Sequence, residues 1–282
     1  MDVTTLKQQI TSKTPAMIYL ALGTQQVLLQ RVREMFINLI PKEERVMNVG
    51  SYDMETTPLA VALDDAMAAP FFGERRLVLI NKPYFFTGEK GPAKIEHDLD
   101  SLSNYLQHPE PSTILVFLAP YEKLDGRKKI VKELKKVAVT VDTAPLDEAH
   151  ARQQVRAELT SDQYTIDETA IEELVQRTNA DYELMNANLS KLKLLTYQDR
   201  HITQQAVKEL VPQSLDENVF DLVNAVLKHD QPRSIDLYDQ LIAGQQPPLR
   251  INAVLISQFR LLLQIKILSS RGLSQGSLAQ KL

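Results

Sequence analysis

The sequence contains no cysteine among its 282 residues. This absence excludes disulfide bonds, catalysis by a thiolate and zinc sites that use cysteine ligands. It is also typical of proteins that work in a reducing compartment.

The chain also has little net charge, because its 36 acidic residues outnumber its 32 basic residues by only four. A protein that holds duplex DNA by itself neutralises many phosphates and usually carries a clear excess of lysine and arginine. The charge balance therefore disfavours an independent DNA-binding protein. Any contact with nucleic acid is expected to be shared with partners.

Targeting segments are missing at the amino-terminus, which has neither the basic segment nor the apolar core of a signal peptide. No apolar stretch is expected to reach the length of a membrane span. We therefore predict a soluble, cytoplasmic protein without a membrane partner.

Known arrangements of catalytic or metal-binding residues are missing as well. The acidic residues do not converge at a metal-ligand spacing, and there is no Gly-x-Ser-x-Gly motif. The histidines are scattered, which favours a surface or structural role for each: His97, His108, His150, His201 and His229. We predict no catalytic residue, no metal and no cofactor.

Short segments of strand length recur through the first half of the chain, and all of them except residues 48–52 are apolar runs. They lie at residues 16–22, 48–52, 77–80, 114–118 and 137–141, and helix-like segments alternate with them. One of these helices is expected to start at Thr56-Thr57-Pro58, with a hydroxyl N-cap and proline at the first helical position. This order predicts a three-layer α/β domain over residues 1–144.

The segment from Gly23 to Val27 lies where an ATPase of this architecture has its phosphate-binding loop, between the first strand and a helix. Such a loop needs several glycines, a lysine that reaches the phosphates and a hydroxyl that binds magnesium. Here Gly23 is followed by Thr-Gln-Gln-Val, with no second glycine and no Gly-Lys-Thr. The sequence predicts the architecture of an ATPase without its phosphate site.

From residue 145 onward strands are expected to disappear and helical periods to take over. We predict a small helical domain over residues 145–212 and a second helical domain over residues 213–282. The last long helix, residues 251–269, is apolar nearly all round, which predicts burial on several sides in its own bundle or in an oligomer. A further helix starts near Ser274 just before the sequence ends, so we expect the natural protein to continue.

Aromatic residues make up only 6% of the chain, yet two phenylalanines are adjacent at Phe71 and Phe72. They lie between a predicted helix and a predicted strand, and the helix breakers Pro70 and Gly73 flank them. Aromatic side chains exposed in this way are typical anchors of a protein interface. The alternative is that one or both pack beneath the first domain.

A basic segment, residues 124–136, lies between the last two predicted strands. Ile130, Val131 and Leu134 form a narrow apolar stripe, which predicts a solvated crossover helix. The alternative is contact with DNA phosphates or with an acidic partner. The lysines that would make this contact are Lys128, Lys129, Lys132, Lys135 and Lys136.

The order and spacing of these features carry a resemblance to a known family. The chain resembles the delta subunit of the bacterial DNA polymerase III clamp loader along essentially its full length, through residues 18–23, 70–80, 123–129, 220–226 and 258–266. The resemblance implies a degenerate ATPase-like (AAA+) α/β domain that has lost nucleotide binding. It also implies that residues 145–212 form a helical lid domain and residues 213–282 a helical collar domain.

The same resemblance implies a function in DNA replication. It implies a non-catalytic subunit of a DNA-directed DNA polymerase (nucleotidyltransferase) holoenzyme that binds and opens the beta sliding clamp. The implied partners are the clamp, the gamma/tau and delta-prime subunits through the collar, and primer-template DNA. Two other functions are weighed against it: an ATP-driven remodelling enzyme of the same architecture, which needs a phosphate cradle, and an independent DNA-binding protein.

Clamp-binding residues are implied by position. Two apolar side chains at the end of a helix bind the clamp in this family, and they match Phe71 and Phe72, with Met67 and Pro70 beside them. The matching pair is often aliphatic and aromatic, so a pair of phenylalanines is a modest departure from the family pattern.

Overall fold

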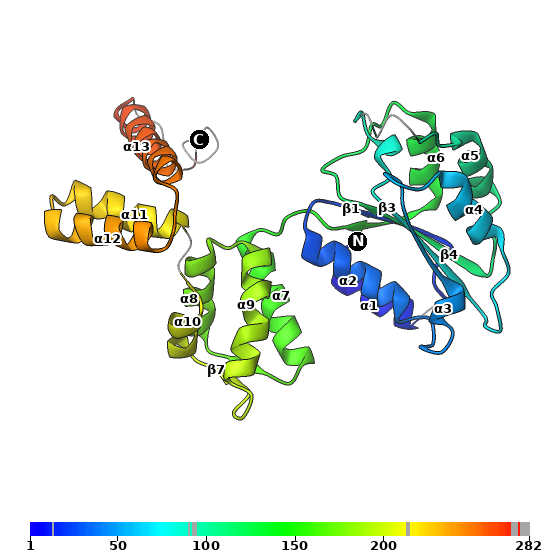
Figure 1. The fold of residues 1–282 in the computed structure, drawn as a ribbon, viewed down its shortest axis with the longest axis horizontal. Coiled ribbons are helices and arrows are strands. Elements are labelled where there is room, and N and C mark those ends of the chain that lie inside the picture. The colour runs from blue at the N-terminus through cyan, green and yellow to red at the C-terminus, as the bar shows by residue number, and fades with distance from the viewer. Residues whose placement is uncertain (13, 90, 92–94, 213–214, 272–275, 277–282) are drawn as a thin grey trace. The chain divides into compact units, whose positions relative to one another are not determined.

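The computed structural model describes residues 1–282 except 13, 90, 92–94, 213–214, 272–275 and 277–282. The chain divides into two compact units, Met1–Leu146 and Asp147–Leu282. Strands and helices alternate in the first unit, whereas the second is almost entirely helical (Figure 1). The predicted fold class, an α/β region followed by helices, is confirmed. The division of the helical half into lid and collar stays a prediction.

The first unit is built on a parallel sheet of five strands in the order β2-β3-β4-β1-β5. Each of the predicted strand segments forms a strand of this sheet. The segment predicted at residues 137–141 starts later, at Val139, because Val137 still belongs to the preceding helix. The strands are β1 (Ile18–Leu22), β2 (Val49–Asp53), β3 (Arg76–Asn81), β4 (Thr113–Ala119) and β5 (Val139–Asp142).

Helices cover both faces of this sheet. Helix α2 (Gln26–Ile37) packs on one face, where the Phe36 ring lies 4.6 Å from the Tyr19 ring. Ile18 and Leu20 point to the opposite face and share a core with α4 (Leu59–Met67), α5 (Leu99–Gln107) and α6 (Lys129–Val137). Figure 1 shows these two helical layers on either side of the strands. Strands β1, β3 and β4 are buried on both faces and are therefore mostly apolar, which is why their runs could be recognised in the sequence.

Three short elements complete the first unit. Helix α1 (Val3–Ser12) buries Val3, Leu6 and Ile10, and it was not predicted. The four-residue helix α3 (Arg45–Asn48) and the 3-10 helix η1 (Tyr84–Phe86) are too short to produce a helical period.

The start of α4 differs from the prediction. Pro58 lies at the N-cap position and not at the first helical position, so no threonine hydroxyl caps the helix, and the Thr56 hydroxyl donates to the carbonyl oxygen of Asp53. The Leu59 N–H donates to Nδ1 of His97 at 3.1 Å, and Nε2 of the same ring lies 3.1 Å from the carbonyl oxygen of Met54. A side chain 38 residues away in sequence therefore caps the helix.

The second unit begins with four helices: α7 (Glu148–Ser161), α8 (Glu168–Thr178), α9 (Tyr182–Leu195) and α10 (Gln204–Leu210). Asp147, Asp181 and Thr203 cap three of them with side-chain oxygens. The expectation that strands disappear after residue 145 is wrong, because β6 (Thr165–Ile166) pairs with β7 (His201–Ile202). Strands of two residues carry no alternation that a sequence could reveal.

Three further helices pack together near the carboxyl-terminus: α11 (Leu215–Leu227), α12 (Gln231–Ala243) and α13 (Pro248–Ser270). Their core includes Val219, Val223, Leu237, Leu241 and Ile251. Only the first turns of α13 reach it. The expectation that its own bundle buries α13 is therefore not met, since most of its large apolar side chains are exposed: Ile256, Phe259, Leu261, Leu262, Leu263, Ile265 and Ile267.

Helix α13 also contradicts the expectation that no stretch reaches the length of a membrane span. Among the described residues it is the one helix long and apolar enough to cross a membrane, with 23 residues and a mean hydropathy of 1.4 over its most apolar window. Length and composition alone do not establish a span, because helices in the core of soluble proteins pass the same test. Exposed apolar side chains of this kind also occur on surfaces that bind another protein chain.

The cap on α4 predicts a pH dependence of stability. Burial lowers the pKa of His97 below its ordinary value of 6.5, against a smaller opposite effect of the bond to Met54. Between the two pKa values the unfolded chain holds a proton that the folded protein does not. The contribution of His97 to the free energy of unfolding is therefore complete above its unfolded pKa and is lost as the pH falls through its folded pKa.

Urea unfolding measured from about pH 7.5 to about pH 5.5 checks this expectation. The variant His97→Gln keeps a side-chain acceptor but cannot take up a proton. It is expected to lose less stability than the wild type over this range. Identical pH dependence of the two proteins would show that His97 does not titrate in this way.

Candidate functional site

The two adjacent phenylalanines lie on the turn between α4 and β3, which we call the Phe turn and define as residues 68–75 (Figure 1). Helix α4 ends at Met67, and the Ala68 N–H still donates to the carbonyl oxygen of Asp65. The exposed fractions are 57% for Met67, 50% for Phe71 and 91% for Phe72. Neither ring is buried beneath the first unit, and Met67 extends the apolar surface that they present.

The backbone of the Phe turn is unusual at Phe72, whose φ angle is 55°. Few residues other than glycine adopt this left-handed conformation, and for a bulky side chain it is strained. The Phe71 and Phe72 rings meet edge to face with their centroids 4.5 Å apart. The two rings therefore support each other on an otherwise open surface.

Asn48, at the end of α3, holds the Phe turn from below. Its Nδ2 donates to the carbonyl oxygen of Phe71 at 2.9 Å, and its Oδ1 accepts from the Phe71 N–H at 2.6 Å. Its side chain is fully buried. The backbone of the Phe turn at Gly73 lies close to Glu44 and Asn48. A Cβ at Gly73 would be 2.2 Å from Oε2 of Glu44 and 2.9 Å from Nδ2 of Asn48. No feature of the sequence marks Asn48 for this position.

Arg76, the first residue of β3, provides a second attachment. Its guanidinium pairs with the Asp65 carboxylate of α4 at 2.5 Å and donates to the carbonyl oxygen of Ala69 at 3.1 Å. Both charged side chains are largely buried. The Phe turn is therefore attached at Ala69 and at Phe71, on the amino-terminal side of Phe72.

Two hollows flank the Phe turn. One, of about 700 Å³, lies beside Phe72 and is lined by residues that include Ile10, Ile40 and Pro41. The other, of about 400 Å³, lies beside Met67 and is lined by residues that include Leu63 and Tyr105. The exposed side chains thus stand between two depressions that a partner surface could fill.

Proteins with parallel α/β sheets bind ligands at the carboxyl edge of the sheet. The loop after β1 lies at this edge, and its backbone is not arranged to bind a phosphate. The Gly23 N–H donates to the carbonyl oxygen of Ala119, and the Gln25 N–H to that of Thr143. Gly23, with φ 148°, lies against Thr143 so closely that a Cβ there would be 2.0 Å from the Thr143 carbonyl carbon. Two amides of this loop are therefore bonded within the fold and do not face a ligand.

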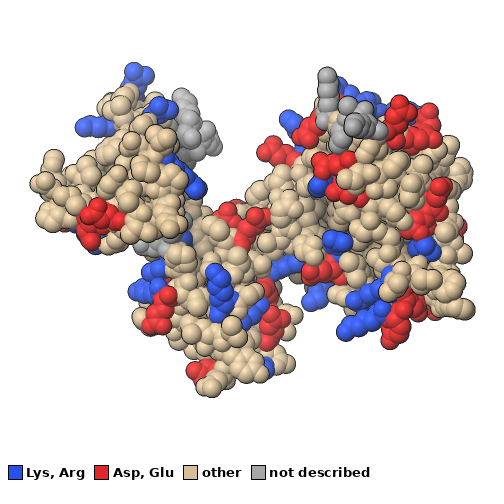
Figure 2. All heavy atoms as spheres, viewed as in Figure 1, with Lys and Arg blue, Asp and Glu red and all other residues tan. Residues whose placement is uncertain are grey.

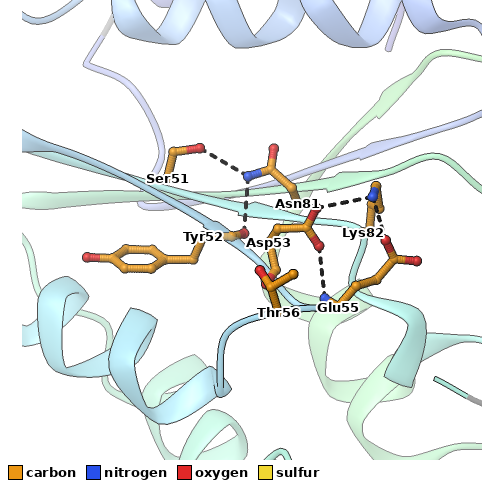
Figure 3. Close-up of polar contacts among 7 residues, drawn as sticks. All are labelled: Ser51, Tyr52, Asp53, Glu55, Thr56, Asn81 and Lys82. Atoms are coloured by element: carbon orange, nitrogen blue, oxygen red, sulfur yellow. Dashed lines mark hydrogen bonds and ion pairs between the residues drawn. The ribbon is translucent and has the colours of Figure 1, made fainter. Parts of the chain in front are cut away.

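At the same edge, polar side chains in the last residues of β2 and β3 and directly after them bond to one another, as Figure 3 shows. Asn81 Nδ2 donates to Ser51 Oγ at 3.1 Å, and Lys82 Nζ lies 3.1 Å from Asp53 and 2.5 Å from Glu55. These bonds raise the pKa of Lys82, the one to Glu55 most strongly. The two carboxylates thus share a single cation that belongs to this chain. No group of three or more metal-ligating side chains occurs within the part of the chain that the structure describes.

The candidate DNA-contacting lysines do not all behave alike. Lys128 precedes α6 and donates to the carbonyl oxygen of Phe85 at 2.9 Å, and Lys129 lies 3.7 Å from Glu133 one turn on. The other three lysines of the set, Lys132, Lys135 and Lys136, are exposed on α6. The apolar stripe of this helix is buried as predicted.

Charged side chains are distributed unevenly over the molecule. On the face drawn in Figure 2, both signs are interspersed over the first unit, whereas the region of α11–α13 shows few charged side chains. This matches the exposed apolar residues of α13. The face drawn in Figure 2 shows no broad field of one sign.

Comparison with known proteins agrees with these observations. Residues 19–144 match the family described as DNA polymerase III, delta subunit, and residues 216–282 match its C-terminal domain. The chain is 36% identical to DNA polymerase III subunit delta of Bacillus subtilis over 269 residues, which cover 94% of this chain and 77% of the relative.

A solved structure, that of the Bacillus subtilis DNA clamp loader delta protein, is similar over 99% of this chain and 82% of its own. The TM-score is 0.69 and the sequence identity 34%. The resemblance inferred from the sequence is confirmed. The chain belongs to the family of DNA polymerase III delta subunits and is a component of the DNA clamp loader.

Proposed function

We propose that this subunit is non-catalytic, that it binds the beta sliding clamp through the Phe turn, and that it opens the clamp ring during DNA replication in the cytoplasm. The observation that carries the proposal is the pair of exposed rings, Phe71 and Phe72, on a turn that buried polar side chains attach to the first unit. Met67 and Pro70 complete the proposed contact surface.

Physical reasoning favours a partner for this surface. An exposed aromatic side chain gains free energy when another protein buries it, and a few such anchors usually dominate the affinity of an interface. A rigid turn loses little conformational entropy on binding. The Phe turn combines the two properties.

The energy for ring opening is proposed to come from other subunits. A phosphate site needs free backbone amides and a lysine that reaches the phosphates. Here the Gly23 and Gln25 amides are bonded internally, and Lys82 pairs with Asp53 and Glu55. These contacts disfavour the alternative of an ATP-driven enzyme, although a hollow of about 550 Å³ remains between α2 and the strand ends.

Assembly with gamma/tau and delta-prime is assigned to the collar, residues 213–282. The match of residues 216–282 to the C-terminal domain of the family and the exposed apolar side chains of α13 support this assignment. Residues 145–212 are assigned to the lid. Contact with primer-template DNA is proposed for the assembled complex, since the net charge of this chain is negative.

The double variant Phe71→Ala with Phe72→Ala is expected to abolish binding to the purified sliding clamp. Removal of one aromatic anchor costs about 2–4 kcal/mol of binding free energy, and both anchors are removed here. Surface plasmon resonance measures the dissociation constants, and circular dichroism checks the fold. Tyr197→Ala is the matched control, because Tyr197 is an exposed aromatic residue of the second unit. Unchanged affinity of the double variant would refute the assignment.

Titration calorimetry with ATP and magnesium is expected to show no saturable binding to the isolated chain. The reason is that the loop after β1 offers no phosphate cradle. A control titration with a nucleotide-binding clamp-loader subunit establishes sensitivity. Tight, magnesium-dependent binding would favour the remodelling enzyme instead.

Charge reversal of Lys132, Lys135 and Lys136 to glutamate tests the contact with DNA. In the assembled loader on its clamp, the affinity for primer-template DNA is expected to fall. The slope of log affinity against log salt is expected to shrink by about 0.9 for each lost phosphate contact. A triple reversal of Lys7, Lys42 and Lys191, which are exposed on other elements, controls for net charge. Equal effects of the two sets would assign α6 to a purely solvated role.

A further inference from the structure

Asn48 is a buried polar residue that lies outside the exposed surface assigned to the clamp. We propose that Asn48 is a positioning residue for clamp binding, which holds the Phe turn in the conformation that the clamp recognises. The proposal rests on the proposed function of Phe71 and Phe72. It adds a residue that supports the contact without touching the partner.

The geometry of the bond pair is specific to a side-chain amide. Asn48 accepts from the Phe71 N–H and donates to the Phe71 carbonyl oxygen, at 2.6 Å and 2.9 Å. A carboxylate has no proton to donate, and a hydroxyl cannot span both groups. The amide orientation is determined by the bonds themselves, because a flipped amide would place NH₂ against N–H. The Asn48 side chain thus bonds both backbone groups of Phe71, as a paired residue in a neighbouring β-strand does.

The neighbouring backbone explains why such a bond pair is needed. Phe72 adopts a left-handed conformation, with φ 55°, that a free chain seldom populates. Strained backbone persists only where the surrounding structure imposes it. Asn48 holds the residue immediately before Phe72, and Arg76 holds Ala69 three residues before it. Without the Asn48 amide, the part of the turn that carries both rings loses its nearest attachment.

The effect on binding follows from the population of the competent conformation. When only a fraction of the molecules hold a binding-competent turn, the apparent affinity falls to that fraction of its full value. A preorganised turn avoids this loss. Asn48 therefore acts on affinity through Phe71, and its effect disappears when the rings are absent.

The first experiment uses the full chain with Asn48→Ala and the purified sliding clamp as the probe. The dissociation constant is expected to rise about tenfold or more, as it does when the competent conformation falls to about a tenth. Hydrogen exchange of residues 68–75 is expected to accelerate, while the amides of β1 and β4 stay protected. Unchanged affinity with unchanged exchange in the Phe turn would overturn the proposal.

The second experiment uses Asn48→Asp, which has nearly the same shape. An ionised carboxylate at this position faces the Phe71 carbonyl oxygen without a proton, whereas a neutral carboxyl donates one and restores both bonds. Burial and the nearby Glu44 carboxylate raise the pKa of the introduced carboxyl, and Arg45 of the same helix is engaged by Ile40 and Asn38. The affinity relative to wild type is expected to recover as the pH falls from about 8 to about 5.5.

This recovery separates positioning from a general loss of stability. Asn48→Ala has no titratable group, so its affinity relative to wild type is expected to stay low over the same pH range. If the alanine variant does not fold, the aspartate variant at low pH carries the test. Absence of recovery in a folded aspartate variant would overturn the proposal.

Two controls complete the design. Asn188→Ala removes a comparably buried amide that bonds to the carbonyl oxygen of Leu184 in α9, and it should leave clamp binding unchanged. The double variant Phe71→Ala with Phe72→Ala, which is expected to lose clamp binding altogether, is the second control. If that double variant binds the clamp as the wild type does, the proposed function fails. If it does not bind while Asn48→Ala binds normally, only the role of Asn48 fails.

Discussion

Strand β3 is the constraint on which the Phe turn at one edge of the sheet and the ion pairs of Lys82 at the other edge depend. It is bonded to β2 on one side and β4 on the other, and its four central residues are buried. Its first residue, Arg76, attaches the Phe turn, and its last, Asn81, leads into the ion pairs of Lys82. Six residues of strand separate these ends by about 20 Å. The edge of the sheet that carries the Phe turn and its carboxyl edge can therefore change independently.

The middle of the sheet was predictable because β1, β3 and β4 are buried on both faces, so each appears in the sequence as an apolar run. Helices and strands that span only about one period of their side-chain pattern could not be predicted. Helix α3 and strands β6 and β7 belong to this group. Helix α1 carries only a weak signal, because Val3, Leu6 and Ile10 are its only apolar residues.

The candidate site was predictable only in its exposed part. Helix breakers around two adjacent rings indicated an exposed turn, and the stripe of α6 indicated which of its residues are buried. The bonds that hold the site join residues far apart in sequence, 23 positions for Asn48 and Phe71 and 38 for Leu59 and His97. Such pairs are set by the tertiary fold, which local patterns do not encode. The exposure of α13 belongs to the same class, because composition alone cannot show whether a neighbour covers an apolar helix.

The left-handed backbone at Phe72 restricts which amino acids evolution can place there. Side chains branched at Cβ, such as valine and isoleucine, are strongly disfavoured in this conformation, although they are apolar enough for an interface. Glycine and asparagine suit the backbone but offer no apolar surface. Apolar residues that are not branched at Cβ, phenylalanine among them, are strained less severely there and still offer apolar surface. The repertoire of this position is thus narrowed by the turn itself, before any partner selects among the residues that remain.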